Sequence, residues 1–164
     1  MRKIVVCLAV WIVGLSFNLS VKAQEKNDKK ESSQTPVIVF VCEHGAAKSI
    51  LAAALFNKLA GERQLNLRAI ARGTKPDPEI APKVARGLEA DGLTASEPAP
   101  KKISQADLVD ARRVITFCEL PGDYPGSVSV ESWDAILPVI EDYIKARDKL
   151  TERINRLLEE LKSK

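Results

Sequence analysis

The sequence predicts an α/β domain with three layers, in which helices cover both faces of a four-stranded parallel sheet. Two observations support this fold class. Residues 36–41 (PVIVFV) form an unbroken apolar run rich in β-branched side chains, which is typical of a strand buried on both faces. Stretches with strand character then alternate with stretches of helical character, which favours parallel strands joined by right-handed crossovers.

The remaining elements follow from local patterns between the first strand and the C-terminus. In chain order, we expect a helix at 50–60, a strand at 67–71, a helix at 80–90, a capped helical turn at 104–107, a strand at 113–117 and a weaker strand at 127–130. From Val139 onward, apolar residues recur at helical spacing. This spacing predicts one long amphipathic helix that packs its apolar stripe on the sheet.

Residues 1–23 have the pattern of a secretory signal peptide. Arg2 and Lys3 form a positive n-region, residues 4–15 are apolar, and Val21-Lys22-Ala23 fits the small-residue cleavage pattern. The apolar stretch is short for a membrane span. We therefore expect cleavage after Ala23 and a periplasmic or secreted product with no stable membrane anchor.

Residues 24–35 (QEKNDKKESSQT) contain no apolar side chain and predict a disordered linker. Residues 36–164 are then left as one domain, long enough for a single core. Residues 1–23 contain three basic residues and no acid, so cleavage leaves 22 basic against 22 acidic residues and removes the net charge of +3. Nucleic-acid binding needs a basic surface. We therefore expect no nucleic-acid partner, and we expect a monomer.

Cys42 directly follows the first predicted strand and precedes a loop of small residues and a helix. In such a place the N–H groups of the loop and the N-terminus of the helix point at one spot and form an anion cradle. The same positive field favours a thiolate, which can attack the phosphorus or arsenic of a bound oxyanion. Ser49 could donate its hydroxyl to that sulfur. The predicted oxyanion-binding loop comprises Glu43, His44, Gly45, Ala46, Ala47 and Lys48.

Two cysteines, Cys42 and Cys118, remain after cleavage of the signal peptide. In an oxidising compartment such a pair usually forms a structural disulfide, and this alternative stands beside the nucleophile. Both cysteines follow predicted strands, and the carboxyl ends of parallel strands border the crevice where such sheets bind ligands. We therefore expect the two thiols to be close enough to pair.

Three other side chains near these motifs receive structural interpretations. His44 is the only histidine, and because a Cys-x-His pair alone rarely binds metal, we expect a solvent-facing loop side chain and neither a metal nor a cofactor. Glu43 would repel an anion if it pointed inward, so we expect it to point out of the cradle. Trp133 is expected to belong to the core.

Four blocks of sequence, in order, resemble the low-molecular-weight protein tyrosine phosphatase and arsenate reductase family. Cys42-x5-Lys48-Ser49 is similar to the family's Cys-x5-Arg-Ser. The other blocks are Ala71-Arg72-Gly73-Thr74, residues 100–116, and Trp133-Asp134 with Tyr143 and Ala146-Arg147-Asp148. The resemblance implies the fold of these phosphatases and an enzyme that hydrolyses phosphomonoesters of the phosphotyrosine type, on a small molecule or a protein. Its catalytic residues would be Cys42, as a phosphocysteine, with Lys48 and Ser49.

The chain departs from the family's pattern at three positions. Lys48, a single mobile charge, replaces the arginine whose planar fork clamps the phosphoryl oxygens. Leu137 stands before Pro138, where the family has its general acid, and Asp134 and Asp123 are the candidate substitutes. Gly45 replaces a loop asparagine, which is benign if the position needs positive φ. The resemblance therefore implies a hydrolase with an impaired site.

Two alternatives to the phosphatase follow from the same resemblance. Cys118 stands where thioredoxin-coupled arsenate reductases of the family keep their second cysteine, but Tyr124-Pro125 occupies the place of their third. One alternative is a thiol-dependent arsenate reductase-like oxidoreductase that uses Cys42 and Cys118. The other is a catalytically impaired oxyanion-binding or redox relative. Each of these would bind a phosphate or arsenate oxyanion.

Overall fold

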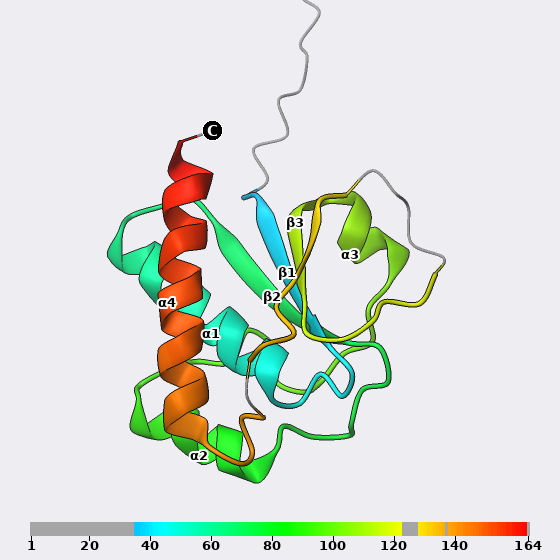
Figure 1. Cartoon of the computed structure of the whole chain (residues 1–164), viewed down its shortest axis with the longest axis vertical. Coiled ribbons are helices and arrows are strands. Elements are labelled where there is room, and N and C mark those ends of the chain that lie inside the picture. Colours follow the sequence, from blue (N-terminus) through cyan, green and yellow to red (C-terminus); the bar gives the residue numbers. More distant parts are fainter. Residues whose placement is uncertain (1–34, 123–127, 137, 164) are drawn as a thin grey trace, which may run out of the picture. The chain divides into compact units, whose positions relative to one another are not determined.

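The computed structural model describes residues 35–122, 128–136 and 138–163 (Figure 1). The predicted signal peptide and all but the last residue of the predicted linker lie outside the described residues. Along the chain the elements are β1 (Val37–Cys42), α1 (Lys48–Glu62), β2 (Arg68–Gly73), α2 (Pro82–Ala90), α3 (Gln105–Val109), β3 (Ala111–Thr116), β4 (Val130–Ser132) and α4 (Tyr143–Lys162). The strands pair in the order β2-β1-β3-β4, and each neighbouring pair is parallel, which confirms the predicted sheet.

β1 is buried along its whole length because helices cover both faces of the sheet. Figure 1 shows α1, α2 and α4 on one side of the sheet and α3 on the other. Alternate side chains of β1 enter the two layers of the core. Ile38, Phe40 and Cys42 pack with the large helices, and Val37, Val39 and Val41 pack in the smaller cluster that includes Leu108 of α3.

An aromatic cluster fills the larger half of the core. The Phe40 ring lies 6.0 Å from the ring of Phe56, 6.3 Å from that of Phe117 and 5.9 Å from that of Trp133, measured between centroids. Trp133 is buried, as predicted. None of the helices in the described parts of the chain has the length and apolar character needed to cross a bilayer.

α4 begins at Tyr143, later than the predicted start at Val139. Asp142 is extended, and its side chain accepts a hydrogen bond from the Lys145 N–H at 3.0 Å, so it caps the helix. The N–H groups of Glu141 and Asp142 donate to the Pro138 carbonyl and close a turn. Val139 is buried in that turn, so the apolar spacing that suggested an earlier helix reflects a buried loop side chain.

The fourth strand also differs from its predicted position. β4 comprises Val130–Ser132 and not residues 127–130, of which residue 127 lies outside the described part. It pairs only with β3, through Val114↔Val130, Ile115↔Glu131 and Thr116↔Ser132. Its residues are exposed or half-buried, so no alternation of apolar side chains marks it in the sequence. By contrast, Ser104 caps α3 through a capping box with Asp107, which confirms the predicted capped turn.

Candidate active site

The loop between β1 and α1 turns its carbonyl groups away from the site. Three loop carbonyls and that of Cys42, the last residue of β1, accept hydrogen bonds from the segment that follows β2. These bonds run from Thr74 N–H to Cys42 O at 3.1 Å, Lys75 to Glu43 at 2.8 Å, Asp77 to His44 at 2.9 Å and Ala81 to Ala46 at 3.1 Å. Within the described residues, no backbone carbonyl accepts from the N–H groups of residues 43–47. These donors and the first turn of α1 are therefore available to an anion.

Two glycines set the distance between this loop and β2. Gly45, which replaces the family's loop asparagine, has φ +61°. The position therefore has the positive φ that glycine adopts freely. A Cβ on Gly73 would lie 2.8 Å from the Gly45 nitrogen and 3.0 Å from the Gly45 Cα. Gly73 is itself held in place, because its N–H donates to Lys101 O and its carbonyl accepts from Ile103 N–H. The backbones approach so closely that a side chain has no room.

The Cys42 sulfur lies at the end of β1 and contacts the hydroxyl of Ser49. The Sγ–Oγ distance is 3.1 Å, Ser49 is fully buried, and Cys42 is 7% exposed. Ser49 is the second residue of α1, whose first residue is Lys48. The contact lets the hydroxyl donate to a thiolate and stabilise its charge.

Cys42 opens into a pocket of about 280 Å³. Small ligand sites typically measure about 300–1,000 Å³, so the pocket suits a small oxyanion and the group next to it. Its reactive or polar lining comprises Cys42, Glu43, His44, Lys48, Asp77 and Cys118, and its apolar lining comprises Ala46, Ala47, Ala81, Phe117, Pro138, Val139 and Ile140. Lys48 makes no ion pair with any described residue, so its charge is available to a ligand. The described residues include no group of three side chains suited to hold a metal ion.

The exposed side chains of Glu43, His44 and Asp77 form the mouth of this pocket, and Lys75 lies beside Glu43. His44 Nδ1 lies 3.1 Å from Asp77 Oδ1, and Lys75 Nζ lies 3.4 Å from Glu43 Oε1. Glu43 is half exposed and its carboxylate is turned toward Lys75. This geometry agrees with the expectation that Glu43 points out of the cradle. The side chain of His44 is 61% exposed, as expected of a loop residue, but it also lines the pocket.

Asp77 is a site residue that the sequence did not reveal. It lies in the loop after β2, and only the pairing of β1 with β2 brings that loop against residues 43–46. No local motif marks this aspartate. Two aspartates were predicted as substitutes for the general acid. Asp134 is exposed and is not among the residues that line the pocket. Asp123 lies outside the described residues, as does Leu137.

Cys118 lines the same pocket as Cys42, and both are free thiols in this structure. Their proximity follows from the sheet, because Val41 pairs with Thr116 and the Phe117 N–H donates to the Val41 carbonyl at 2.8 Å. Burial raises the pKa of Cys118, and the nearby Cys42 and Glu43 add to this effect, which hydrogen bonds from Thr116 and Thr74 only partly offset. A smaller fraction of Cys118 is therefore thiolate at neutral pH than for an ordinary cysteine.

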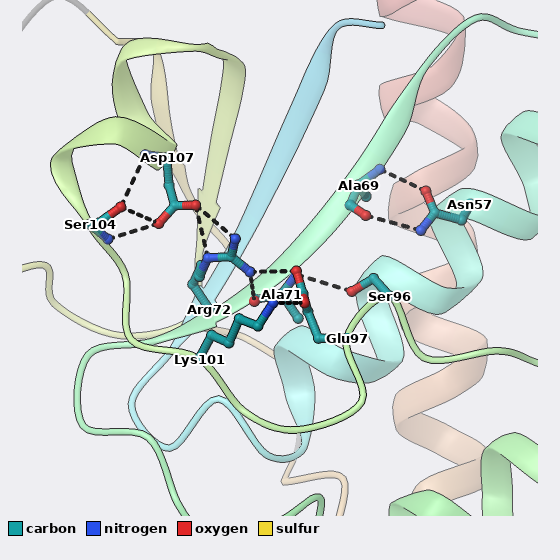
Figure 2. Close-up of polar contacts among 9 residues, drawn as sticks. All are labelled: Asn57, Ala69, Ala71, Arg72, Ser96, Glu97, Lys101, Ser104 and Asp107. Atoms are coloured by element: carbon teal, nitrogen blue, oxygen red, sulfur yellow. Dashed lines mark hydrogen bonds and ion pairs between the residues drawn. The ribbon is translucent and has the colours of Figure 1, made fainter.

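An ion-pair network supports the end of β2 beside Gly73 (Figure 2). Arg72 lies between two carboxylates, with Nη1 2.8 Å from Glu97 and Nη2 2.8 Å from Asp107, and the three side chains are 11–13% exposed. Burial alone would raise the pKa of Glu97, but hydrogen bonds from Lys101 and Arg72 hold that pKa below its ordinary value. Burial alone would likewise raise the pKa of Asp107, but hydrogen bonds from Arg72 and Ser104 hold that pKa below its ordinary value. Arg72 thus ties β2 to α3 and to the segment that contains Glu97.

Comparison with known proteins supports the resemblance. The sequence model of the low molecular weight phosphotyrosine protein phosphatase family matches residues 37–150, which is more than half of the chain. A thioredoxin-dependent arsenate reductase from Corynebacterium glutamicum superposes with a TM-score of 0.68 at 24% identity, over 81% of this chain and 65% of that one. This chain therefore spans slightly less than two thirds of that reductase.

Two other solved structures share the fold over nearly their whole length. The low molecular weight protein tyrosine phosphatase from T. tengcongensis has a TM-score of 0.66 at 19% identity, over 76% of this chain and 99% of that one. The arsenate reductase from Archaeoglobus fulgidus has a TM-score of 0.59 at 26% identity, over 73% of this chain and 97% of that one. With the match over residues 37–150, the chain belongs to the low molecular weight phosphotyrosine protein phosphatase family.

Proposed function

We propose that this protein is an exported phosphatase that hydrolyses phosphomonoesters of the phosphotyrosine type through a phosphocysteine at Cys42. One observation carries the proposal: Cys42 lines a pocket beside a loop whose N–H groups have no described backbone acceptor, while the carbonyls of Glu43, His44 and Ala46 accept hydrogen bonds from the segment after β2. An anion cradle beside a nucleophile is the arrangement that phosphoryl transfer requires. Export rests on the n-region, apolar stretch and cleavage pattern of residues 1–23 alone.

The reaction has two steps at one sulfur. The N–H groups of residues 43–47 and the Lys48 ammonium hold the phosphoryl oxygens, and the Cys42 thiolate attacks the phosphorus. The P–O bond to the leaving group breaks as the P–S bond forms. Water then attacks the phosphocysteine, the P–S bond breaks, and its electron pair returns to the sulfur. The Ser49 hydroxyl, 3.1 Å away, stabilises the thiolate released in this second step.

Replacing Cys42 by serine is expected to lower phosphatase activity by about 10³-fold or more, because the nucleophile is lost. The measurement is the steady-state hydrolysis of 4-nitrophenyl phosphate by reduced protein. Cys118→Ser is the matched control, since the phosphatase reaction does not use this thiol, and it should retain most of the activity. Equal turnover by wild type and Cys42→Ser would rule out the proposed function.

Lys48→Arg is expected to raise the kcat/KM for 4-nitrophenyl phosphate by about tenfold or more. A guanidinium can bind two phosphoryl oxygens at once, whereas an ammonium acts as a point charge. Losing one preorganised donor typically costs about 10²–10³ in rate, so only part of that range should be recovered. Lys48→Gln, which removes the charge, should lower the rate. A Gln variant as active as the Arg variant would show that Lys48 does not contact the transferred group.

The second candidate is an arsenate reductase, favoured by the presence of both thiols in one pocket. The Cys42 thiolate would attack arsenic, and one As–O bond would break as that oxygen leaves, once protonated, as water. Cys118 would then attack the Cys42 sulfur, the S–As bond would break, and arsenite would leave with its electron pair as As(V) becomes As(III). The resulting disulfide would require a dithiol reductant. The raised pKa of Cys118 disfavours its attack at neutral pH. Loss of both free thiols after one equivalent of arsenate, without added reductant, would favour this function over the phosphatase.

A further inference from the structure

The proposed phosphatase needs a proton donor for its leaving group. Expelling an alkoxide or aryloxide is slow unless an acid protonates the departing oxygen. In this chain Leu137 stands where the family has its acid, and the neighbouring residues Pro138 and Val139 present only apolar groups to the pocket. Among the described residues, we therefore look for the donor in another part of the lining.

His44 and Asp77 form a pair at the mouth of the pocket that meets this need. His44 Nδ1 lies 3.1 Å from Asp77 Oδ1, and the Asp77 N–H donates to the His44 carbonyl at 2.9 Å. The aspartate is thus fixed to the histidine through both backbone and side chain. Because a carboxylate accepts the Nδ1 proton, this contact sets the tautomer and leaves Nε2 for another partner.

The Nε2 atom of His44 makes no hydrogen bond within the described residues. Its nearest charged neighbour is Glu43 Oε2 at 3.8 Å, which is beyond hydrogen-bond distance. Glu43 also faces Lys75, which lies 3.4 Å from its other oxygen. The charged groups around the ring are therefore Glu43 and Lys75 on one side and Asp77 on the other. Nε2 therefore has no hydrogen-bond partner among the described residues, on a side chain that lines the pocket.

We propose that His44 is the general acid and base of the phosphatase and that Asp77 is its positioning residue. This assignment rests on the proposed function. Among the other groups in the lining, the Lys48 ammonium faces the phosphoryl oxygens in the proposed reaction, and Glu43 is directed toward Lys75. Histidine is the side chain suited to exchange a proton near neutral pH.

The proton transfers balance over the two steps. As Cys42 attacks and the P–O bond breaks, the leaving oxygen takes the electron pair of that bond and the proton from His44 Nε2. His44 is then neutral, with its remaining proton on Nδ1 toward Asp77. In the second step, Nε2 accepts a proton from the water that attacks the phosphocysteine. The P–S bond breaks, Cys42 is a thiolate again, and His44 is again protonated.

The test compares two esters that differ in their need for an acid. Phenyl phosphate has a poor leaving group and needs protonation, whereas 4-nitrophenyl phosphate needs it little. His44→Gln is expected to lower kcat/KM by about 10²–10³-fold for phenyl phosphate and by less than about tenfold for 4-nitrophenyl phosphate. The alkaline fall of kcat/KM with phenyl phosphate should also disappear. The ratio of the two losses does not depend on the folded fraction of the variant.

Asp77→Asn separates the positioning residue from the donor. It should lower phenyl phosphate turnover less than His44→Gln and keep the alkaline fall. A larger loss in Asp77→Asn than in His44→Gln would assign the proton to Asp77 and overturn the proposal. If His44→Gln lowers kcat/KM equally for both esters while turnover still depends on Cys42, the assignment of His44 is overturned. The proposed phosphatase function is not affected by that result. If neither ester is hydrolysed in a Cys42-dependent reaction, both the assignment of His44 and the proposed phosphatase function are overturned.

Discussion

Replacing Arg72 by methionine is expected to lower the free energy of unfolding by about 3–5 kcal/mol. The change leaves the carboxylates of Glu97 and Asp107 nearly buried without their shared guanidinium, and removing one partner of a buried ion pair typically costs this much. Denaturant unfolding at neutral pH measures this loss in the free energy of unfolding. Arg68→Met on the same strand is the matched control, because Arg68 is exposed and makes no ion pair with a described residue. That variant should change stability by less than about 0.5 kcal/mol.

The same network predicts how this loss depends on pH. Glu97 and Asp107 have lowered pKa values in the folded protein, so their contribution is fully present above the ordinary carboxyl pKa of about 4 and is lost as pH falls through the lowered values. The difference between wild type and Arg72→Met should therefore shrink below about pH 4. A difference that stays constant into acid, or an Arg68→Met variant as unstable as Arg72→Met, would contradict this account of the network.

Gly73→Ala is expected to lower kcat/KM for aryl phosphates by about 10²-fold in a protein that still folds. The new Cβ would lie 2.8–3.0 Å from backbone atoms of Gly45 and His44, so the oxyanion loop must move. A displacement on the order of 1 Å at a catalytic group can cost about this much. The measurement is steady-state kinetics together with a thermal unfolding curve that reports the folded fraction.

Gly61→Ala provides the control for Gly73→Ala. Gly61 lies in α1, and a Cβ there would meet no heavy atom within 4 Å. This variant should keep its activity and gain up to about 1 kcal/mol in stability, because alanine is the better helix former. If Gly73→Ala were as active as Gly61→Ala, the close approach of the loop and β2 would not be needed for the site.

The sequence was sufficient for those parts of the fold that local pattern determines. The apolar run at 36–41 predicted a strand buried on both faces, and β1 is an interior strand between β2 and β3. The loop after Cys42 was predicted as an anion cradle, and within the described residues its N–H groups have no backbone acceptor, while anion binding there stays a prediction. In both places the signal and its structural consequence lie within a few residues of each other.

The sequence was insufficient where distant segments meet. Asp77 joins His44 across 33 positions, and Arg72 joins Glu97 and Asp107 across 25 and 35. Such partners depend on strand order and register, which no local pattern records. The start of α4 was placed too early for a related reason, since the burial of Val139 comes from tertiary packing and not from a helix.

The central claim is that Cys42 carries the phosphoryl group during turnover. The most direct measurement is a denaturing quench during the reaction with an aryl phosphate, followed by peptide mapping and ³¹P detection of the modified residue. The account predicts a phosphorus–sulfur bond on Cys42 that decays when the substrate is exhausted and is absent from Cys42→Ala. Turnover with the phosphoryl group on another residue, such as His44, or with no covalent intermediate at all, would contradict it.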